Sequence, residues 1–167
     1  MLSVANIVPT LILLLGVVDD LRSRKVHNWL FLALLVAAAL SQYVFAGFGG
    51  VREGLFGFGA AFLGCLPLVM ARIIGGGDLK LMAAFGMATS WPITLSVILW
   101  SLVWGALLGL IRATVAGELP KLLVSTYNVA VRRKPAEATL HRIPYTIALM
   151  FGWLTVMTLS RLPGGLL

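Results

Sequence analysis

The stretch Asn28–Gly47, NWLFLALLVAAALSQYVFAG, runs for 20 residues without a charged side chain. A helix of about 20 apolar residues is long enough to cross the hydrocarbon core of a bilayer, which is roughly 30 Å thick. Similar apolar stretches recur along the chain, and each is bounded by charged residues, glycine or proline. This pattern predicts a protein built from membrane-spanning helices.

The composition supports the same class. Of the 167 residues, 60% are hydrophobic and 11% are charged, whereas charged residues make up about a quarter of a typical soluble domain. Helices are expected at about 4–18, 28–47, 54–74, 79–91, 92–115 and 143–160. We expect an all-α fold, a polytopic membrane helical bundle with about six transmembrane helices, forming a single domain over 1–167. The segment 79–91 is short for a span, at about 20 Å.

The basic residues predict the orientation of the bundle. With the N-terminus outside, only Arg52 and Arg161 of the 13 basic residues fall outside. The other 11 fall on the cytoplasmic side: Arg22, Arg24, Lys25, Arg72, Lys80, Arg112, Lys121, Arg132, Arg133, Lys134 and Arg142. Because cytoplasmic loops of membrane proteins are enriched in Lys and Arg, this asymmetry favours an N-terminus outside. The same dispersal of basic residues gives no indication of nucleic-acid binding.

Two further segments have simple interpretations. The segment 4–18 has no basic residue before it and no Ala-x-Ala-like site after it, so we expect a retained helix and no cleaved signal peptide. Polar and apolar residues alternate with helical spacing over 117–138, between Pro120 and Pro135, which predicts an amphipathic helix on the cytoplasmic leaflet. Its role is either anchorage or guidance of a substrate.

Metal-dependent and serine hydrolases have no support in the sequence. A His-Glu-x-x-His motif is absent, and His27 and His141 lack carboxylate or Cys companions at ligand spacing. No Gly-x-Ser-x-Gly elbow is present either. The lone Cys65 lies in an apolar stretch and is expected to be a packing residue. We expect no metal and no other cofactor.

Carboxylates are rare, and three of the six are placed where an ionisable group is costly. Glu53, Glu118 and Glu137 fall in predicted loops, but Asp19, Asp20 and Asp78 fall at the cytoplasmic ends of predicted helices. Asp19 and Asp20 are adjacent, so they point about 100° apart on a helix. Gly16 suggests a close helix contact on the side of Asp20, but the periodicity alone does not choose between the two.

Asp78 has two interpretations. An Asp before the apolar run LKLMAAFGMA is a favoured helix N-cap. Alternatively, two carboxylates at the same rim of a bundle could share a proton while one of them activates a water, as in aspartic proteases. Gly75, Gly76 and Gly77 would let the main chain turn tightly and approach a neighbour closely. Lys80 is expected to be a cytoplasmic anchor.

Three motifs resemble those of the type IV prepilin peptidases, in particular the small Flp/Tad-type members. They are DLRSRKVHNWL over Asp20–Leu30, GGGDLKLMAAFG over Gly75–Gly86, and the looser RIPYTIALMFG over Arg142–Gly152. The resemblance assigns Asp20, and not Asp19, as the first catalytic residue and Asp78 as the second. It also assigns Gly75, Gly77, Lys80 and Asn28 as motif and site-shaping residues. The chain departs from the family at His27, where Pro is usual, and at Thr146, where Gly is usual.

The resemblance implies an intramembrane aspartic endopeptidase of the bacterial inner membrane. Such an enzyme removes the leader of prepilins or pseudopilins at the cytoplasmic face, so its partners would be those precursors, the pilus or secretion machinery and the bilayer. The larger family members add a Cys-rich zinc insert and methylate the new terminus. With one Cys and no such insert, this chain is expected to cleave without methylating.

Other functions remain compatible with the residues. An ion-coupled transporter would use Asp20 and Asp78 to bind a cation, although no inverted repeat is visible. In a non-catalytic assembly factor, Asp78 would serve only as a helix cap. A lipoprotein signal peptidase would use similar acid chemistry without the Gly-x-Gly-Asp pairing.

Overall fold

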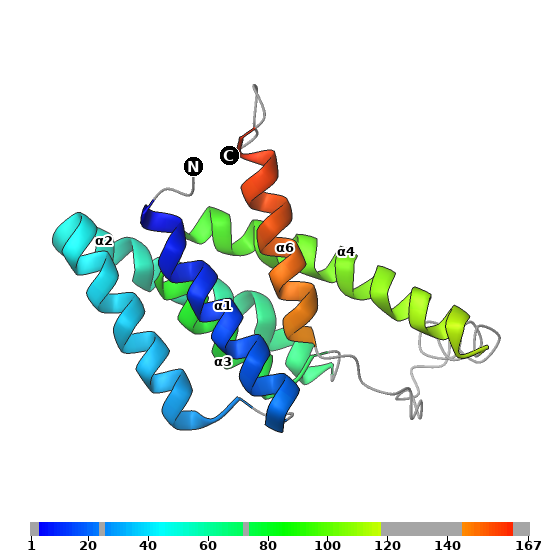
Figure 1. Ribbon diagram of the computed structural model, residues 1–167. Helices are drawn as coiled ribbons and strands as arrows, with labels where there is room; N and C mark the ends of the chain where they lie inside the picture. The colour runs from blue at the N-terminus through cyan, green and yellow to red at the C-terminus, as the bar shows by residue number, and fades with distance from the viewer. Residues whose placement is uncertain (1–3, 24–25, 72–73, 118–144, 162–167) are drawn as a thin grey trace.

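A computed structural model describes residues 4–23, 26–71, 74–117 and 145–161. Within these ranges the chain forms five α-helices and no β-strand, so the all-α prediction is confirmed (Figure 1). The helices are α1 (Val4–Ser23), α2 (Asn28–Met70), α3 (Gly76–Met87), α4 (Trp91–Val115) and α6 (Tyr145–Leu159). From residue 118 onward, the predicted amphipathic helix over 117–138 lies outside the described residues.

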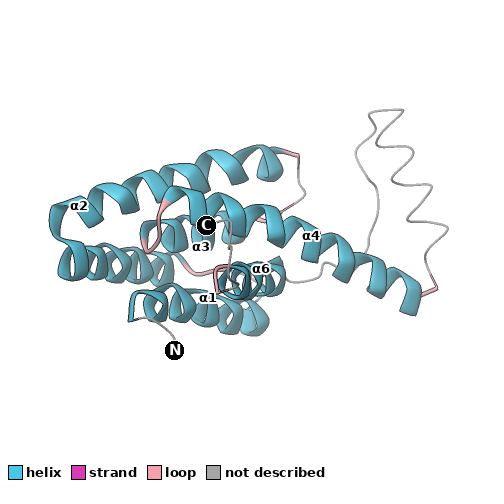
Figure 2. Ribbon diagram, turned by 90° about the horizontal axis from the view of Figure 1, so that it is seen from above, coloured by secondary structure: helices cyan, strands magenta, loops and turns pink. Residues whose placement is uncertain are grey.

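Helix α2 contains two of the predicted helices, joined at a sharp break. Gly47 has φ 63° and ψ −152°, a backbone conformation that is open to glycine but strained for other residues. The chain reverses direction there (Figures 1 and 2). A Cβ placed on Gly54 would lie 3.4 Å from the side chain of Gln42, although 12 residues of straight helix would span about 18 Å. The predicted break is therefore correct, but the predicted non-helical linker over 48–53 is wrong, because helix resumes immediately.

Helix α3 is the buried centre of the bundle. Every residue from Leu81 to Thr89 is buried, and α3 packs against α2, α1 and α4. A Cβ on either Gly57 or Gly86 would collide with the backbone of the other, so α2 and α3 approach each other closely where both lack side chains. Because its neighbours cover it, α3 has little contact with the surroundings of the bundle. This explains how a helix of 12 residues, about 18 Å long, fits the fold.

The start of α3 differs from the prediction. The helix was expected at about 79–91, but it begins at Gly76, and Gly75 with φ −82° and ψ 156° is its N-cap. Gly76 and Gly77 therefore belong to the first helical turn, and neither has a positive φ. Of the three glycines expected to allow a tight turn, only Gly75 lies outside the helix. The expected close approach of a glycine to a neighbour is found at Gly77, as described below.

Helix α6 packs against α4 and α1. A Cβ on Gly152 would meet the backbone of Val97 and Ser101 at 2.9 Å, so α4 and α6 touch through their main chains. On the other side, the indole of Trp153 donates a hydrogen bond to Thr10 Oγ1 at 2.9 Å. The C-terminal half of α4 projects beyond the other helices (Figures 1 and 2).

The outer surface is strongly apolar. Large hydrophobic side chains are exposed on α1, α2 and α4, among them Val44 at 74%, Phe48 at 82% and Leu63 at 71%. Such extensive apolar surface is not found on a monomeric soluble protein. By length and composition, α2 and α4 could each cross a membrane, and α6 is a shorter apolar helix. These features indicate a membrane protein.

Candidate active site

Asp20 lies on the face of α1 that turns toward α3 and α6. One turn earlier, a Cβ on Gly16 would collide with the side chain of Leu81, so this glycine lies where α1 meets α3. The Oδ2 atom of Asp20 accepts a hydrogen bond from Thr146 Oγ1 at 2.9 Å. The sequence argument that Gly16 marks a close contact on the side of Asp20 is therefore consistent with the packing.

Asp78 is the third residue of α3 and is half-buried. Its Oδ2 atom accepts a hydrogen bond from the backbone N–H of Gly75 at 3.0 Å. The residue therefore satisfies an amide at the start of the helix, although it lies inside the helix and not at the N-cap position considered from the sequence. This bond does not exclude a chemical role, because it engages only one of the two carboxylate oxygens.

The structure brings the two acids together. Helices α1 and α3 pack against each other, with Gly16 against Leu81, and Gly77 at the start of α3 lies against Val26, just beyond the end of α1. Asp20 and Asp78, 58 positions apart in the sequence, are thus carried by adjacent ends of α1 and α3.

The glycines before Asp78 have separable roles. A Cβ on Gly77 would lie 3.3 Å from both the backbone N and the Cγ2 of Val26, so the start of α3 rests on the segment that leads into α2. A Cβ on Gly75 would lie 3.2 Å from Asp78 Oδ2 and would crowd the carboxylate. Nothing lies within 4 Å of a Cβ on Gly76. Gly75 and Gly77, the two glycines assigned by the motif, are therefore the two at which a Cβ would crowd a neighbouring atom.

Asn28 and Lys80 are also brought together. The ammonium group of Lys80 donates a hydrogen bond to Asn28 Oδ1 at 2.6 Å. Asn28 is the first residue of α2 and Lys80 the fifth of α3, so the bond ties the starts of these two helices beside Asp78. Lys80 was expected to be a membrane-surface anchor, and this contact gives it a second, local role.

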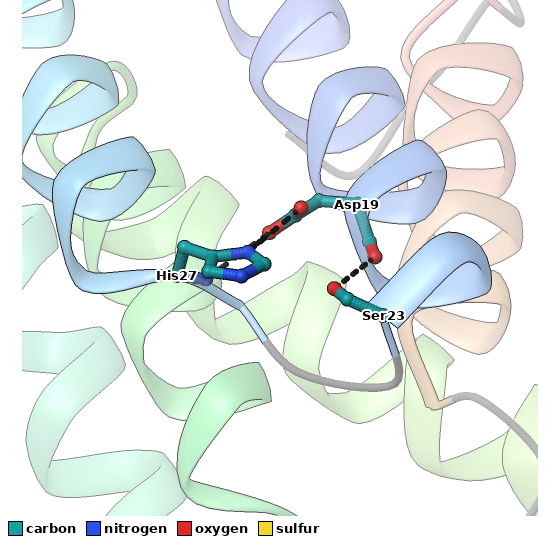
Figure 3. Close-up of polar contacts among 3 residues, drawn as sticks. All are labelled: Asp19, Ser23 and His27. Carbon is teal, nitrogen blue, oxygen red and sulfur yellow. Dashed lines mark hydrogen bonds and ion pairs between the residues drawn. The ribbon is translucent and has the colours of Figure 1, made fainter.

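The side chain of Asp19 contacts His27 (Figure 3). The backbone N–H of His27 donates to Asp19 Oδ2 at 3.1 Å, and His27 Nδ1 lies 3.0 Å from Asp19 Oδ1. The main-chain carbonyl of Asp19 accepts a hydrogen bond from Ser23 Oγ at 2.7 Å. Asp19 follows the apolar segment 4–18. Burial alone would raise its pKa, but the hydrogen bonds from His27 outweigh burial and hold the pKa below its ordinary value.

His27 adopts a backbone conformation that proline also adopts, with φ −66° and ψ 142°. The family motif has proline at this position, and from the sequence alone nothing replaced the ring that would fix the backbone there. The contacts supply the explanation, because the bonds to Asp19 hold a residue whose φ is not fixed by a ring. Asp19, which had no predicted role, therefore holds His27, the residue just before α2, against the end of α1.

Two residues at the site were not identified as functional from the sequence. Thr146 was noted only as a departure from the family motif, yet its side chain contacts Asp20. Ser101, in the middle of α4, has no sequence signal, and its Oγ lies 2.7 Å from the hydroxyl of Tyr145. Among the described residues, no group of three or more His, Cys, Asp or Glu side chains could hold a metal ion.

The comparisons with known proteins agree with the resemblance seen in the motifs. The model of the type IV leader peptidase family matches residues 7–110, which is more than half of the chain and includes Asp20 and Asp78. Helix α6 lies beyond the matched region. No curated protein and no solved structure matches the chain. The extent of the family match, which spans both acid motifs, shows that the chain belongs to the type IV leader peptidase family.

Proposed function

We propose that the chain is a prepilin leader peptidase of the aspartic type, with Asp20 and Asp78 as its two catalytic residues. Family membership implies a peptidase and a prepilin substrate. The observation that supports the residue assignment is the packing of α1 against α3, which puts the helix ends that carry Asp20 and Asp78 at the same end of the bundle. Gly75, Gly77, Lys80 and Asn28 shape the site by holding the start of α3 in place.

The proposed chemistry follows from two neighbouring carboxyl groups. Because two nearby negative charges repel each other, one carboxyl keeps a proton while the other is ionised. The ionised group takes a proton from a water molecule, whose oxygen bonds to the carbon of the scissile peptide. The protonated group donates to the carbonyl oxygen, and the C–N bond then breaks as the leaving nitrogen takes up a proton. Two carboxyl groups and one water account for every atom of the hydrolysis.

The site is proposed to lie at the cytoplasmic face of the bacterial inner membrane. The first half of α2 runs from Asn28, beside the site, to the break at Gly47, which is about 28 Å of helix. The site and this break therefore lie at opposite ends of a bundle about as tall as a bilayer core. We propose six spans with the N-terminus outside, an arrangement in which the acids would lie at the cytoplasmic end. There they would reach the leader of a precursor supplied by the pilus or secretion machinery.

The narrower substrate assignment rests on the resemblance of the motifs. The Flp-type prepilins and pseudopilins are the proposed substrates, because the motifs resemble those of the Flp/Tad-type peptidases. With a single cysteine, the chain lacks the residues for a Cys-rich zinc insert. We therefore propose cleavage without methylation of the new terminus.

The decisive experiment is co-expression of a Flp-type prepilin with Asp20→Asn and Asp78→Asn variants. Asn can still accept the hydrogen bonds from Thr146 and Gly75, so both variants should enter the membrane at normal abundance. Each should lose prepilin cleavage, read by the mobility of the prepilin on a gel. Glu53→Gln, an exposed carboxylate close to the Gly47 break, is the matched control and should cleave normally.

Normal cleavage by either Asp→Asn variant would refute the catalytic assignment. Cation-dependent solute uptake into proteoliposomes that is lost in Asp78→Asn would instead favour a transporter. If Asp78→Asn is silent in both assays, Asp78 serves only the Gly75 amide and the chain is an assembly factor.

A further inference from the structure

Thr146 is the described residue that hydrogen-bonds the side chain of Asp20. Its side chain is completely buried, and its hydroxyl donates to Asp20 Oδ2 at 2.9 Å across 126 positions of sequence. We propose that Thr146 is a positioning residue that fixes the orientation of the Asp20 carboxylate for hydrolysis. The proposal rests on the proposed function, because it takes Asp20 as catalytic.

The position of Thr146 is set by contacts on both sides of α6. Immediately before it, the hydroxyl of Tyr145 pairs with Ser101 Oγ of α4 at 2.7 Å. Two turns further, Gly152 lets α6 rest on the backbone of α4, and Trp153 is hydrogen-bonded to Thr10 of α1. The first turn of α6 is therefore held between α1 and α4 independently of Asp20. A hydroxyl on such a fixed element can hold a carboxylate more precisely than one on a loop.

The hydrogen bond leaves part of Asp20 available. It engages Oδ2, and within the described part of the chain Oδ1 has no hydrogen-bond donor. A carboxylate fixed through one oxygen cannot rotate freely, so the other oxygen keeps a defined direction. Activation of a water depends on such placement, since an error of about 1 Å can cost roughly 100-fold in rate. A valine of similar shape keeps the packing of Thr146 but cannot donate.

The experiment measures cleavage of a purified Flp-type prepilin by the full-length enzyme in detergent micelles. Thr146→Val should lower kcat by roughly 10-fold or more with little change in KM. Thr146→Ser, which keeps the hydroxyl, should restore most of kcat. Thr155→Val is the matched control, because it removes a threonine hydroxyl from the same helix that accepts a hydrogen bond from Trp104 away from Asp20. This control should cleave at the wild-type rate.

The outcomes separate this inference from the proposed function. If Asp20→Asn is inactive but Thr146→Val has wild-type kcat, the positioning role is refuted and the catalytic dyad stands. If Thr146→Ser loses as much kcat as Thr146→Val, the hydroxyl is not the cause and the inference also fails. Should Thr146→Val not accumulate in the membrane, Thr146→Ala tests the same loss of the hydroxyl without a branched side chain. If Asp20→Asn cleaves normally, the proposed function itself fails.

Discussion

Lys80 donates a hydrogen bond to Asn28 across 52 positions of sequence, with 2.6 Å between Nζ and Oδ1. Asn28 belongs to the motif Asp20–Leu30, and Lys80 follows Asp78 by two residues. The two acid motifs are therefore joined by their own polar side chains as well as by helix packing. The bond fixes where α3 starts relative to α2, and so it helps to place Asp78 beside Asp20.

We predict that Lys80→Met and Asn28→Ala impair the same interaction. Each should lower the free energy of unfolding by about 0.5–1.5 kcal/mol, the usual net value of a hydrogen bond, and should reduce prepilin cleavage. Because both remove one bond, the double variant should be little worse than either single variant. Thermal unfolding and cleavage rates of the four proteins form the double-mutant cycle. Fully additive losses would show that the two residues act separately.

Gly76 and Gly77 should respond differently to alanine, although they are adjacent. A Cβ on Gly77 would press on Val26 at 3.3 Å, and the segment between α1 and α2 would have to shift by a few tenths of an ångström. Gly77→Ala should therefore lower prepilin cleavage severalfold, whereas Gly76→Ala has open space and should cleave normally. The two variants are matched in chemistry and differ only in surroundings. Equal cleavage by both would mean that contact with Val26 does not shape the site.

Much of the fold follows from the distribution of apolar residues and glycine. Each of the six predicted apolar helices overlaps a helix of the structure, two of them within α2, because the apolar runs are long and Gly47, Gly75 and Pro92 lie at or near their ends. The start of α3 was missed because its first residues, Gly76, Gly77 and Asp78, are not apolar and so fall outside the apolar run. In the structure Asp78 binds the Gly75 amide, and Gly77 packs against Val26, a contact between distant parts of the chain. The central, buried place of α3 also depends on tertiary packing, since periodicity does not distinguish a protein-covered apolar helix from a lipid-facing one.

The sequence predicted the motif residues of the candidate site but not the polar side chains that contact them. Asp20, Asp78, Gly75 and Gly77 follow from the motifs and lie together. By contrast, Thr146 and His27 looked only like departures from a pattern, and their hydrogen bonds to Asp20 and Asp19 became visible only in three dimensions. A residue that departs from a motif can bring a hydrogen-bonding side chain of its own. Its partner is not visible in the motif, because the partner lies elsewhere in the sequence.

The contact between Asp19 and His27 should hold the segment between α1 and α2. Asp19→Asn removes the negative charge from the side chain that His27 contacts. We therefore expect faster trypsin cleavage of this Arg- and Lys-containing segment in inverted membrane vesicles. His27→Ala should have a similar effect, and the two changes together should be no worse than one. Glu53→Gln, the same carboxylate-to-amide change at an exposed site close to the Gly47 break, is the control. Unchanged cleavage in Asp19→Asn would contradict the role.

This contact should also respond to acid with a defined sign. The pKa of Asp19 is lower in the folded protein than in the unfolded chain, so its stabilisation is present above the unfolded value. It is lost as the pH falls through the folded pKa, when Asp19 becomes protonated. The wild-type segment should therefore stay resistant to an acid-stable protease until the pH is below the ordinary range of an Asp. A segment that opens already near neutral pH would show that Asp19 is not the group that matters.

The proposed orientation can be tested with single cysteines, because the native Cys65 is 1% exposed and should react poorly. In a Cys65→Ala background, Arg52→Cys lies close to the Gly47 break, whereas Arg22→Cys lies next to the acids, at the other end of the bundle. Both side chains are exposed. With the N-terminus outside, a membrane-impermeant maleimide should label only Arg52→Cys in spheroplasts and both variants after permeabilisation. Labelling of Arg22→Cys alone in intact spheroplasts would show that the orientation is the opposite one. The acids would then face away from a cytoplasmic leader peptide.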